Sequence, residues 1–188
     1  MTWLIVGLGN PGPTYANTRH NVGYLVADVL AERVGAAFKA HPSKRADVVE
    51  GRLADQRVVI ARARSYMNES GGAVSTLAKY YDIEPEHIIA IHDEIDIALG
   101  QLRLKFGGGD NGHNGLKSLR KSLGTGDFFR ARVGVGRPHG STEVHDHVLK
   151  SFTAAERQEL PFLVVEAADA VESLISKGLE PTQQAFNR

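Results

Sequence analysis

Apolar runs rich in valine and isoleucine alternate along the chain with segments that carry apolar residues at helical spacing. The strand-like runs are Trp3–Leu8, Ala46–Leu53, Val58–Ala63, Ile88–His92, Leu102–Phe106 and Ala131–Val135. Helical patterns cover residues 21–34, 69–81, 116–123 and a longer segment, 153–177. This alternation predicts an α/β fold whose sheet is twisted, mixed and largely parallel, with α-helices on its faces.

One pair of runs departs from the strand–helix alternation. Residues 46–53 and 58–63 are separated too briefly for a crossover helix, so they predict an antiparallel hairpin with residues 54–56 in its turn. The rest of the chain has no repeat, low-complexity tract or linker. A length of 188 residues is enough for one hydrophobic core, and we expect a single domain over residues 1–188.

The last long helix carries its own boundary signals. Thr153 and Glu156 have the spacing of a capping box, and Gly178 is suited to end the helix. Pro161 lies inside this segment, so we expect it to kink the helix or to mark its true start.

The composition excludes several classes of chemistry. The chain has no cysteine, which removes thiol nucleophiles, cysteine–zinc sites and disulfides and fits a reducing compartment. The N-terminal residues do not form a signal peptide, and the apolar runs fall short of the roughly 20 residues that cross a membrane. We therefore expect a cytoplasmic protein with no membrane partner.

Three of the predicted strands run directly into polar loops. Asn10 and then His20 follow the first strand, Asp93 directly follows the fourth, and a glycine-rich loop with His113 and Asn114 follows the fifth. Ligands of open α/β sheets bind beyond the carboxyl ends of the strands, so these side chains are candidates for one site.

His20 and Asp93 suggest general-base chemistry, because a carboxylate can orient an imidazole that moves protons near neutral pH. Glu94 and Asp96 remain alternative carboxylates, and a helix cap or turn former is the alternative role for Asp93. The serine motifs G-x-S-x-G and S-x-x-K are absent. We therefore predict a hydrolytic centre that activates water and uses neither a metal nor a cofactor.

Two other motifs suggest different functions. Residues 7–12 match the dinucleotide pattern G-x-G-x-x-G, but Pro11 and Pro13 favour a loop where that pattern needs a helix. His145 and His147 are potential metal ligands, although no third ligand stands at an informative spacing. A nicotinamide-dependent oxidoreductase and a metal-dependent hydrolase thus stay as weaker alternatives, together with a non-catalytic RNA-binding protein.

The charge is uneven although the net charge is zero. Residues 100–140 contain eight lysines and arginines but only two acidic residues. This segment also contains residues 107–115, a loop with several glycines that is not a Walker loop but lets backbone N–H groups approach a ligand. A basic segment on a neutral protein indicates a local polyanion-binding surface.

Taken together, these segments resemble the bacterial-type peptidyl-tRNA hydrolases. The matching blocks are V-G-L-G-N-P-G-x-x-Y-x-x-T-R-H-N-x-G at 6–23, Y-M-N-x-S-G at 66–71, H-D-E-I-D at 92–96, G-x-x-R-x-K-x-G-G-G-x-x-G-H-N-G-L-x-S at 100–118 and R-x-R-V-G-V-G-R-P at 130–138. The resemblance implies a monomeric α/β esterase that cleaves the bond between a peptide and the 3′ ribose of tRNA, without a cofactor or metal.

The resemblance also implies roles for individual residues. His20 falls on the catalytic base and Asp93 on the carboxylate that orients it. Lys105 and Arg132 fall on the pair that holds the tRNA 5′-phosphate. The positions implied to bind substrate or line its cleft are Asn10, Tyr15, Tyr66, Met67, Asn68, His113 and Asn114.

Some positions depart from the commoner family pattern. Tyr66 follows Ser65 where Thr-Phe is usual, and Ile95 follows Glu94 where leucine is usual. Asp110 adds a negative charge beside the expected RNA path, and the resemblance does not determine its effect on tRNA affinity.

Overall fold

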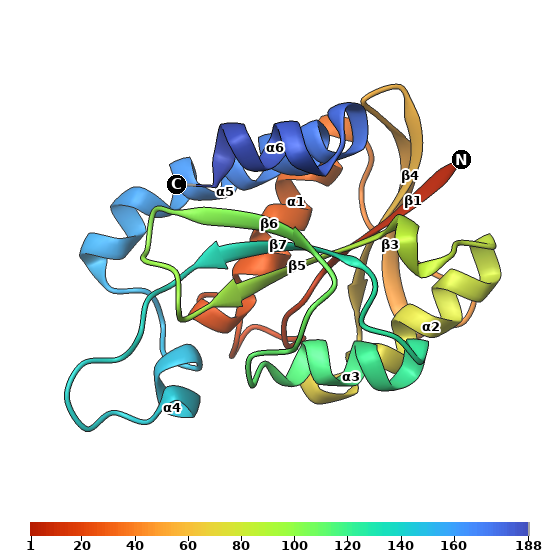
Figure 1. The fold of residues 1–188 in the computed structure, drawn as a ribbon. Coiled ribbons are helices and arrows are strands. Elements are labelled where there is room, and N and C mark those ends of the chain that lie inside the picture. Colours follow the sequence, from red (N-terminus) through yellow and green to blue (C-terminus); the bar gives the residue numbers. More distant parts are fainter. Residues whose placement is uncertain (188) are drawn as a thin grey trace.

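The computed structural model describes residues 1–187, whose centre is a seven-stranded sheet in the order β2-β3-β4-β1-β5-β7-β6 (Figure 1). The strands are β1 (Thr2–Gly7), β2 (Lys39–Ala40), β3 (Ala46–Leu53), β4 (Gln56–Ala63), β5 (Ile88–Glu94), β6 (Leu102–Phe106) and β7 (Phe129–Gly134). The mixed α/β fold expected from the sequence is confirmed.

The parallel part of the sheet is its centre. Strand β1 pairs in parallel with β4 and β5, and β5 pairs in parallel with β7. The outer pairings β2–β3, β3–β4 and β6–β7 are antiparallel. Every residue of β5 is buried, as expected for a strand covered on both faces. The carboxyl ends of β1 and β5 therefore meet at one edge.

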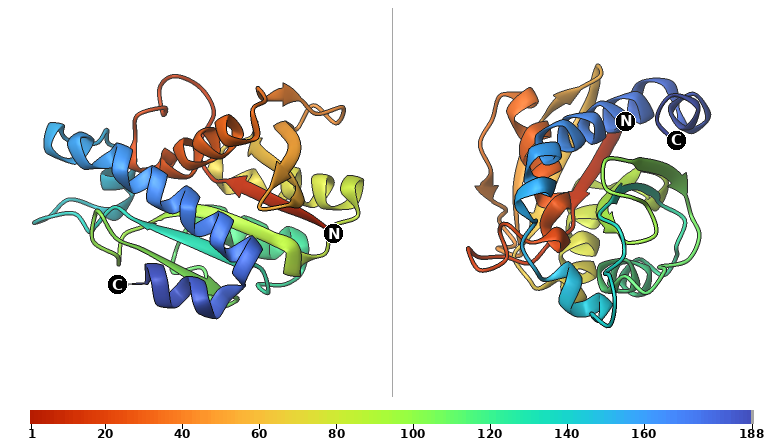
Figure 2. Two further views of the ribbon diagram at one scale, coloured as in Figure 1. Left: turned by 90° about the horizontal axis from the view of Figure 1, so that it is seen from above. Right: turned by 90° about the vertical axis from the view of Figure 1, so that its left-hand side faces the viewer.

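Helices cover both faces of the sheet (Figures 1 and 2). Helices α1 and α5 pack on one apolar cluster, with α6 beside β6, and helices α2 and α3 pack on a second cluster across the sheet. Helix α4 lies near η1, away from both layers. The bounds are α1 (Val22–Val34), α2 (Ser70–Tyr81), α3 (Asn114–Leu123), α4 (Val144–Val148), α5 (Ala154–Lys177) and α6 (Leu179–Phe186), with the 3-10 turns η1 (Arg19–Asn21), η2 (Met67–Glu69) and η3 (Pro85–His87).

The β3–β4 hairpin is present, but its turn is tighter than predicted. Leu53 pairs directly with Gln56, so only Ala54 and Asp55 form the turn. Both turn residues have positive φ angles, as a type I′ hairpin turn requires.

Helix α5 has the predicted capping box. The Thr153 hydroxyl accepts from the Glu156 amide, the Glu156 carboxylate accepts from the Thr153 amide, and Gly178 follows the last helical residue. Pro161 lies inside the helix, so the expectation that it marks the true start is wrong. The helix continues because proline removes only one N–H donor and packing on the sheet compensates.

None of the helices in residues 1–187 combines the length and the hydropathy that crossing a bilayer requires.

Candidate active site

A cavity of about 430 Å³ opens at the carboxyl ends of β1 and β5. Its volume is in the usual range for small-molecule sites. All nine residues predicted to be catalytic or to bind substrate line it: Asn10, Tyr15, His20, Tyr66, Met67, Asn68, Asp93, His113 and Asn114. Lys105 and Arg132 do not line it.

Helix α1, which follows the loop after β1, packs very close to the sheet. A Cβ atom on Gly23 would lie 2.4 Å from the carbonyl oxygen of Ile91, so only glycine lets α1 approach the sheet this closely. The 3-10 turn η1 directly precedes α1 and carries His20. This close packing therefore places His20 beside the end of β5.

Three hydrogen bonds hold Asn10 in place. Asn21 accepts from the Asn10 amide at 2.8 Å and donates to its carbonyl at 2.9 Å, and the Met67 amide donates to Asn10 Oδ1 at 2.7 Å. Because Oδ1 is engaged in this way, the polar group that Asn10 can offer to a ligand is the Nδ2 amide.

His20 and Asp93 form the pair expected from the sequence. The distance from His20 Nδ1 to Asp93 Oδ2 is 2.8 Å, and both side chains are buried. An ionised carboxylate only accepts hydrogen bonds, so Nδ1 carries the ring proton. The other ring nitrogen, Nε2, then has a free lone pair, and the ring lines the cavity.

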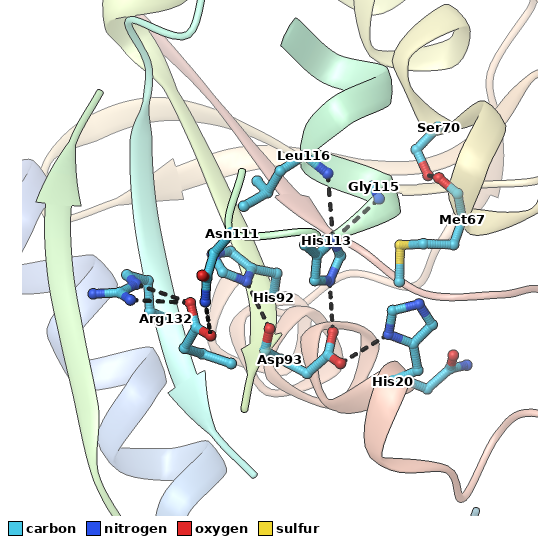
Figure 3. A network of polar contacts seen from close by, with 12 residues as sticks. His20, Met67, Ser70, His92, Asp93, Asn111, His113, Gly115, Leu116 and Arg132 are labelled. Carbon is cyan, nitrogen blue, oxygen red and sulfur yellow. Dashed lines mark hydrogen bonds and ion pairs between the residues drawn. The ribbon is translucent and has the colours of Figure 1, made fainter. Parts of the chain in front are cut away.

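A second histidine contacts the same carboxylate (Figure 3). His113 Nε2 lies 2.7 Å from Asp93 Oδ1. On the opposite side of the ring, Nδ1 accepts from the amides of Gly115 and Leu116, so His113 is the N-cap of α3. The cap explains why α3 begins at Asn114, two residues earlier than predicted.

The two rings keep Asp93 ionised. Burial by itself raises the pKa of the Asp93 carboxyl, but the contacts with His20 and His113 outweigh it and hold the pKa below its usual range. The carboxylate is therefore a permanent acceptor for both rings at neutral pH.

The predicted substrate-binding residues around the pair lie on separate elements. Asn68 belongs to η2 and Asn114 is the first residue of α3; both are exposed and face the cavity. Tyr15 and Tyr66 meet edge to face, with ring centroids 6.2 Å apart, and Tyr66 is 55% exposed. The cavity thus has amide groups and aromatic rings around one buried imidazole.

The predicted phosphate-binding residues lie next to the cavity, on the β6–β7 side. Arg132 is paired with Glu94, with Nη2 and Oε1 3.0 Å apart. Burial, together with Arg132 and Arg130, lowers the pKa of Lys105, so the two predicted residues are near each other. Glu94 also accepts from Asn111 at 2.8 Å, which ties the glycine-rich loop to β5.

Asp110 has a structural role in this loop. One of its oxygens accepts from the Gly112 amide at 3.0 Å and the other contacts Arg120 at 3.2 Å. Its negative charge is thereby directed at a neighbouring arginine.

Within residues 1–187, His20, Asp93 and His113 form the only group with the spacing of a metal site. A metal on His113 Nε2 would leave the proton on Nδ1, where it would face two amide donors. These residues therefore fit a metal poorly. His147 Nε2 donates to the carbonyl oxygen of Gly136 at 3.0 Å, and His145 is not part of a metal cluster with it in the described chain.

The dinucleotide alternative also finds no support in the local structure. Residues 8–18 form a loop, and α1 begins only at Val22. A helix that starts inside the glycines, which the pyrophosphate needs, is missing from this part of the described chain.

One wall of the cavity was not predicted from the sequence. Val144, Val148 and Leu149 contribute apolar surface from α4 and its end, and Ile95 and Asn111 contribute from the loops after β5 and β6. The apolar pair at i and i+4 in α4 was the available signal, but five helical residues are too few for a clear period.

The fold and the site together define an enzyme of the hydrolase class, an α/β domain with a histidine–carboxylate pair at its main cavity. A family model described as peptidyl-tRNA hydrolase matches residues 4–188. The chain therefore belongs to the peptidyl-tRNA hydrolase family, and the resemblance found in the sequence is confirmed.

Individual relatives agree with this assignment. The chain is 59% identical over 184 residues to the peptidyl-tRNA hydrolase of Mycolicibacterium smegmatis, covering 98% of this chain and 96% of that protein. It is 56% identical over 190 residues to that of Streptomyces coelicolor, covering 98% and 94%. The crystal structure of the Acinetobacter baumannii enzyme matches with a TM-score of 0.89 at 37% identity, covering 99% and 93%.

Proposed function

We propose that His20 is the general base that activates water to cleave the ester between a peptide and the 3′ ribose of tRNA. The observation that supports this most directly is the buried 2.8 Å contact of His20 Nδ1 with Asp93 Oδ2, which leaves Nε2 as the proton acceptor. A positioned base of this kind typically contributes about 10²–10⁴-fold to a rate.

The reaction then needs no covalent enzyme intermediate. Water loses a proton to His20 Nε2 as its oxygen bonds to the ester carbonyl carbon. The carbonyl oxygen becomes an oxyanion that Asn10 Nδ2 is suited to stabilise, with Asn68 and Asn114 holding the substrate. When the ester C–O bond breaks, the ribose oxygen takes the proton back from His20, giving a free peptide and tRNA.

The role of His20 can be tested with the variant His20→Asn, by measuring the rate of N-acetyl-aminoacyl-tRNA cleavage in single-turnover experiments. The rate should fall by about 10²–10⁴-fold while substrate binding changes little, because the ring acts mainly in the transition state. His87→Asn is the matched control, since η3 precedes β5 and lies at the opposite end of that strand. A His20→Asn enzyme within a few-fold of wild type would refute the assignment.

For tRNA binding we propose that Lys105 and Arg132 contact a phosphate of the acceptor stem. Their proximity to each other and to the cavity supports this role. Phosphate has to compete with Glu94 for Arg132, so the contact exchanges one ion pair for another. We also expect a monomer that acts in the cytoplasm, as the family resemblance implies.

The double substitution Lys105→Gln/Arg132→Gln should raise KM and flatten its dependence on salt. Each lost phosphate contact should reduce the slope of log KM against log salt by about 0.7–0.9. Arg52→Gln/Arg57→Gln is the control, because these cations sit beside the hairpin turn at the far end of the sheet. An unchanged slope in the first double variant would locate the phosphate contacts elsewhere.

A further inference from the structure

We propose that His113 is a positioning residue: capping of α3 locks its ring in the neutral Nε2–H form, and the ring uses that proton to set how strongly Asp93 holds the proton of His20. The inference deepens the proposed function and rests on it for its kinetic readout. In this role His113 acts through Asp93, in addition to lining the cavity.

The cap decides which nitrogen of His113 carries the proton. The amides of Gly115 and Leu116 point at Nδ1 from 3.0 and 3.3 Å, so Nδ1 has to be an acceptor. In a neutral imidazole the proton is then on Nε2. Protonating Nδ1 as well would direct an N–H group at two other N–H groups, so the cap opposes a charged ring.

The close packing around the ring keeps it in this orientation. A Cβ atom on Gly115 would lie 2.9 Å from the ring carbon Cε1 and 2.6 Å from Met67 Sδ. His92 packs edge-on against His113, with ring centroids 5.0 Å apart. The ring therefore has little freedom to turn its nitrogen away from Asp93 (Figure 3).

Asp93 is shared between the two rings. His113 Nε2 donates to Oδ1 at 2.7 Å, while Oδ2 accepts from His20 Nδ1 at 2.8 Å. A hydrogen bond to an ionised acceptor stabilises the ionised form and reduces its pull on other protons. His113 thus weakens the stabilisation that Asp93 gives to a protonated His20, and it favours the unprotonated Nε2 that acts as the base.

The other charged and titratable groups nearby are mostly paired or neutral. Arg19 of η1 is paired with Glu156 of α5 at 2.7 Å, and the Glu94 and Arg132 pair joins β5 to β7. Burial lowers the pKa of His92 to about 3, so its ring is neutral at working pH. From α4, His145 lines the same cavity, and this titratable group is common to the wild type and both variants.

Two substitutions separate the two functions of the His113 ring. His113→Asn keeps an acceptor for the α3 amides, because asparagine is a favoured N-cap, but its side chain is too short to reach Asp93. His113→Gln has an amide donor that reaches toward Asp93, but it lacks the acceptor at the Nδ1 position. Both are compared with the wild type for melting temperature and for the pH profile of kcat.

The expected results differ between the variants. His113→Asn should move the acid limb of the kcat profile up by roughly 0.5–1 pH unit, because a hydrogen bond to a charged group is worth about 1–2 units and only part of this passes to His20. Its melting temperature should stay near that of the wild type. His113→Gln should keep the acid limb in place and lose about 2–4 °C in melting temperature, since it loses the cap.

Nitrogen-15 NMR of the histidine rings tests the proposal without any substrate. At pH 7.5 the His113 ring should carry its proton on Nε2 and none on Nδ1, and in His113→Asn the Nδ1–H proton of His20 should change its chemical shift, because Asp93 then accepts from His20 alone. A proton on His113 Nδ1, or an unchanged His20 Nδ1–H signal in His113→Asn, would overturn the proposal. Because this readout needs no hydrolysis, its failure is distinguishable from failure of the proposed function.

Discussion

At the residue scale, Asp93 determines the geometry of the site. It is buried at the end of β5, and each of its oxygens has a different ring as donor. As an acceptor it fixes the tautomer of His20, and it accepts the Nε2 proton that the α3 cap assigns to His113. Neither ring would be oriented in this way by a neutral side chain of the same shape.

Asp93→Asn should therefore cost more than the loss of one charge. An amide presents a donor to one of the two rings, so His20 is expected to turn its proton to the wrong nitrogen, and kcat should fall by about 10²–10⁴-fold. Substrate binding, measured by competition with an uncleavable analogue, should change far less. A kcat within ten-fold of wild type would mean that Asp93 does not orient the base.

At the element scale, close contact between α1 and the strand ends places η1 and its histidine. Gly23→Ala would put a Cβ atom 2.4 Å from the Ile91 carbonyl oxygen and 2.7 Å from that of Leu8. Both contacts are with backbone, so the helix has to move. We expect a loss of about 1–3 kcal/mol in stability, seen as a lower melting temperature, and a lower kcat because His20 moves with the helix.

Gly72→Ala is the control for this prediction. It also lies in a helix, α2, but its added Cβ would meet only the guanidinium end of the long Arg45 side chain, 2.4 Å away, and no backbone atom. Alanine is the better helix former, so stability should be unchanged or rise by up to about 1 kcal/mol. Equal melting temperatures for the two variants would contradict the proposed role of Gly23.

The elements that the sequence predicted well are those with strong local signals. The buried strand β5 and the capped helix α5 have apolar periodicity and end signals within their own residues. Strand β2 has two residues and α4 has five, which is too short for a period. Helix α6 was missed as well, and its contacts with β6, such as Gln183 to the Leu104 carbonyl, are tertiary.

The site shows the same division. The residue types at the strand ends predicted the pairing of His20 and Asp93, because strand ends meet at one edge. The bond from Met67 to Asn10, the pairing of Glu94 with Arg132 and the helix cap by His113 depend on how loops fold over that edge. Spacing along the chain carries no information about these contacts, so only the structure reveals them.

At the scale of the whole molecule, one buried ring couples stability to pH. His92 lies inside β5, and its Nδ1 is 2.8 Å from the Asp93 carbonyl oxygen. Its Nε2 has no hydrogen-bond partner among residues 1–187. Burial lowers the pKa of His92 from 6.5 to about 3. A charge on this ring is thus strongly unfavourable in the folded protein.

The unfolded chain takes up this proton near pH 6.5, whereas the folded protein does so only near pH 3. Between these values the unfolded state binds more protons, so the contribution of His92 is fully present above about pH 6.5 and is lost as the pH falls. At about pH 5 the loss amounts to about 2 kcal/mol, or about 4–8 °C in melting temperature.

His92→Phe removes this contribution to the pH dependence, so its melting temperature should fall less between about pH 7.5 and pH 5 than that of the wild type. The exposed His139, changed to Asn, should leave the difference unaltered. If His92→Phe loses as many degrees as the wild type, the acid sensitivity originates in other groups.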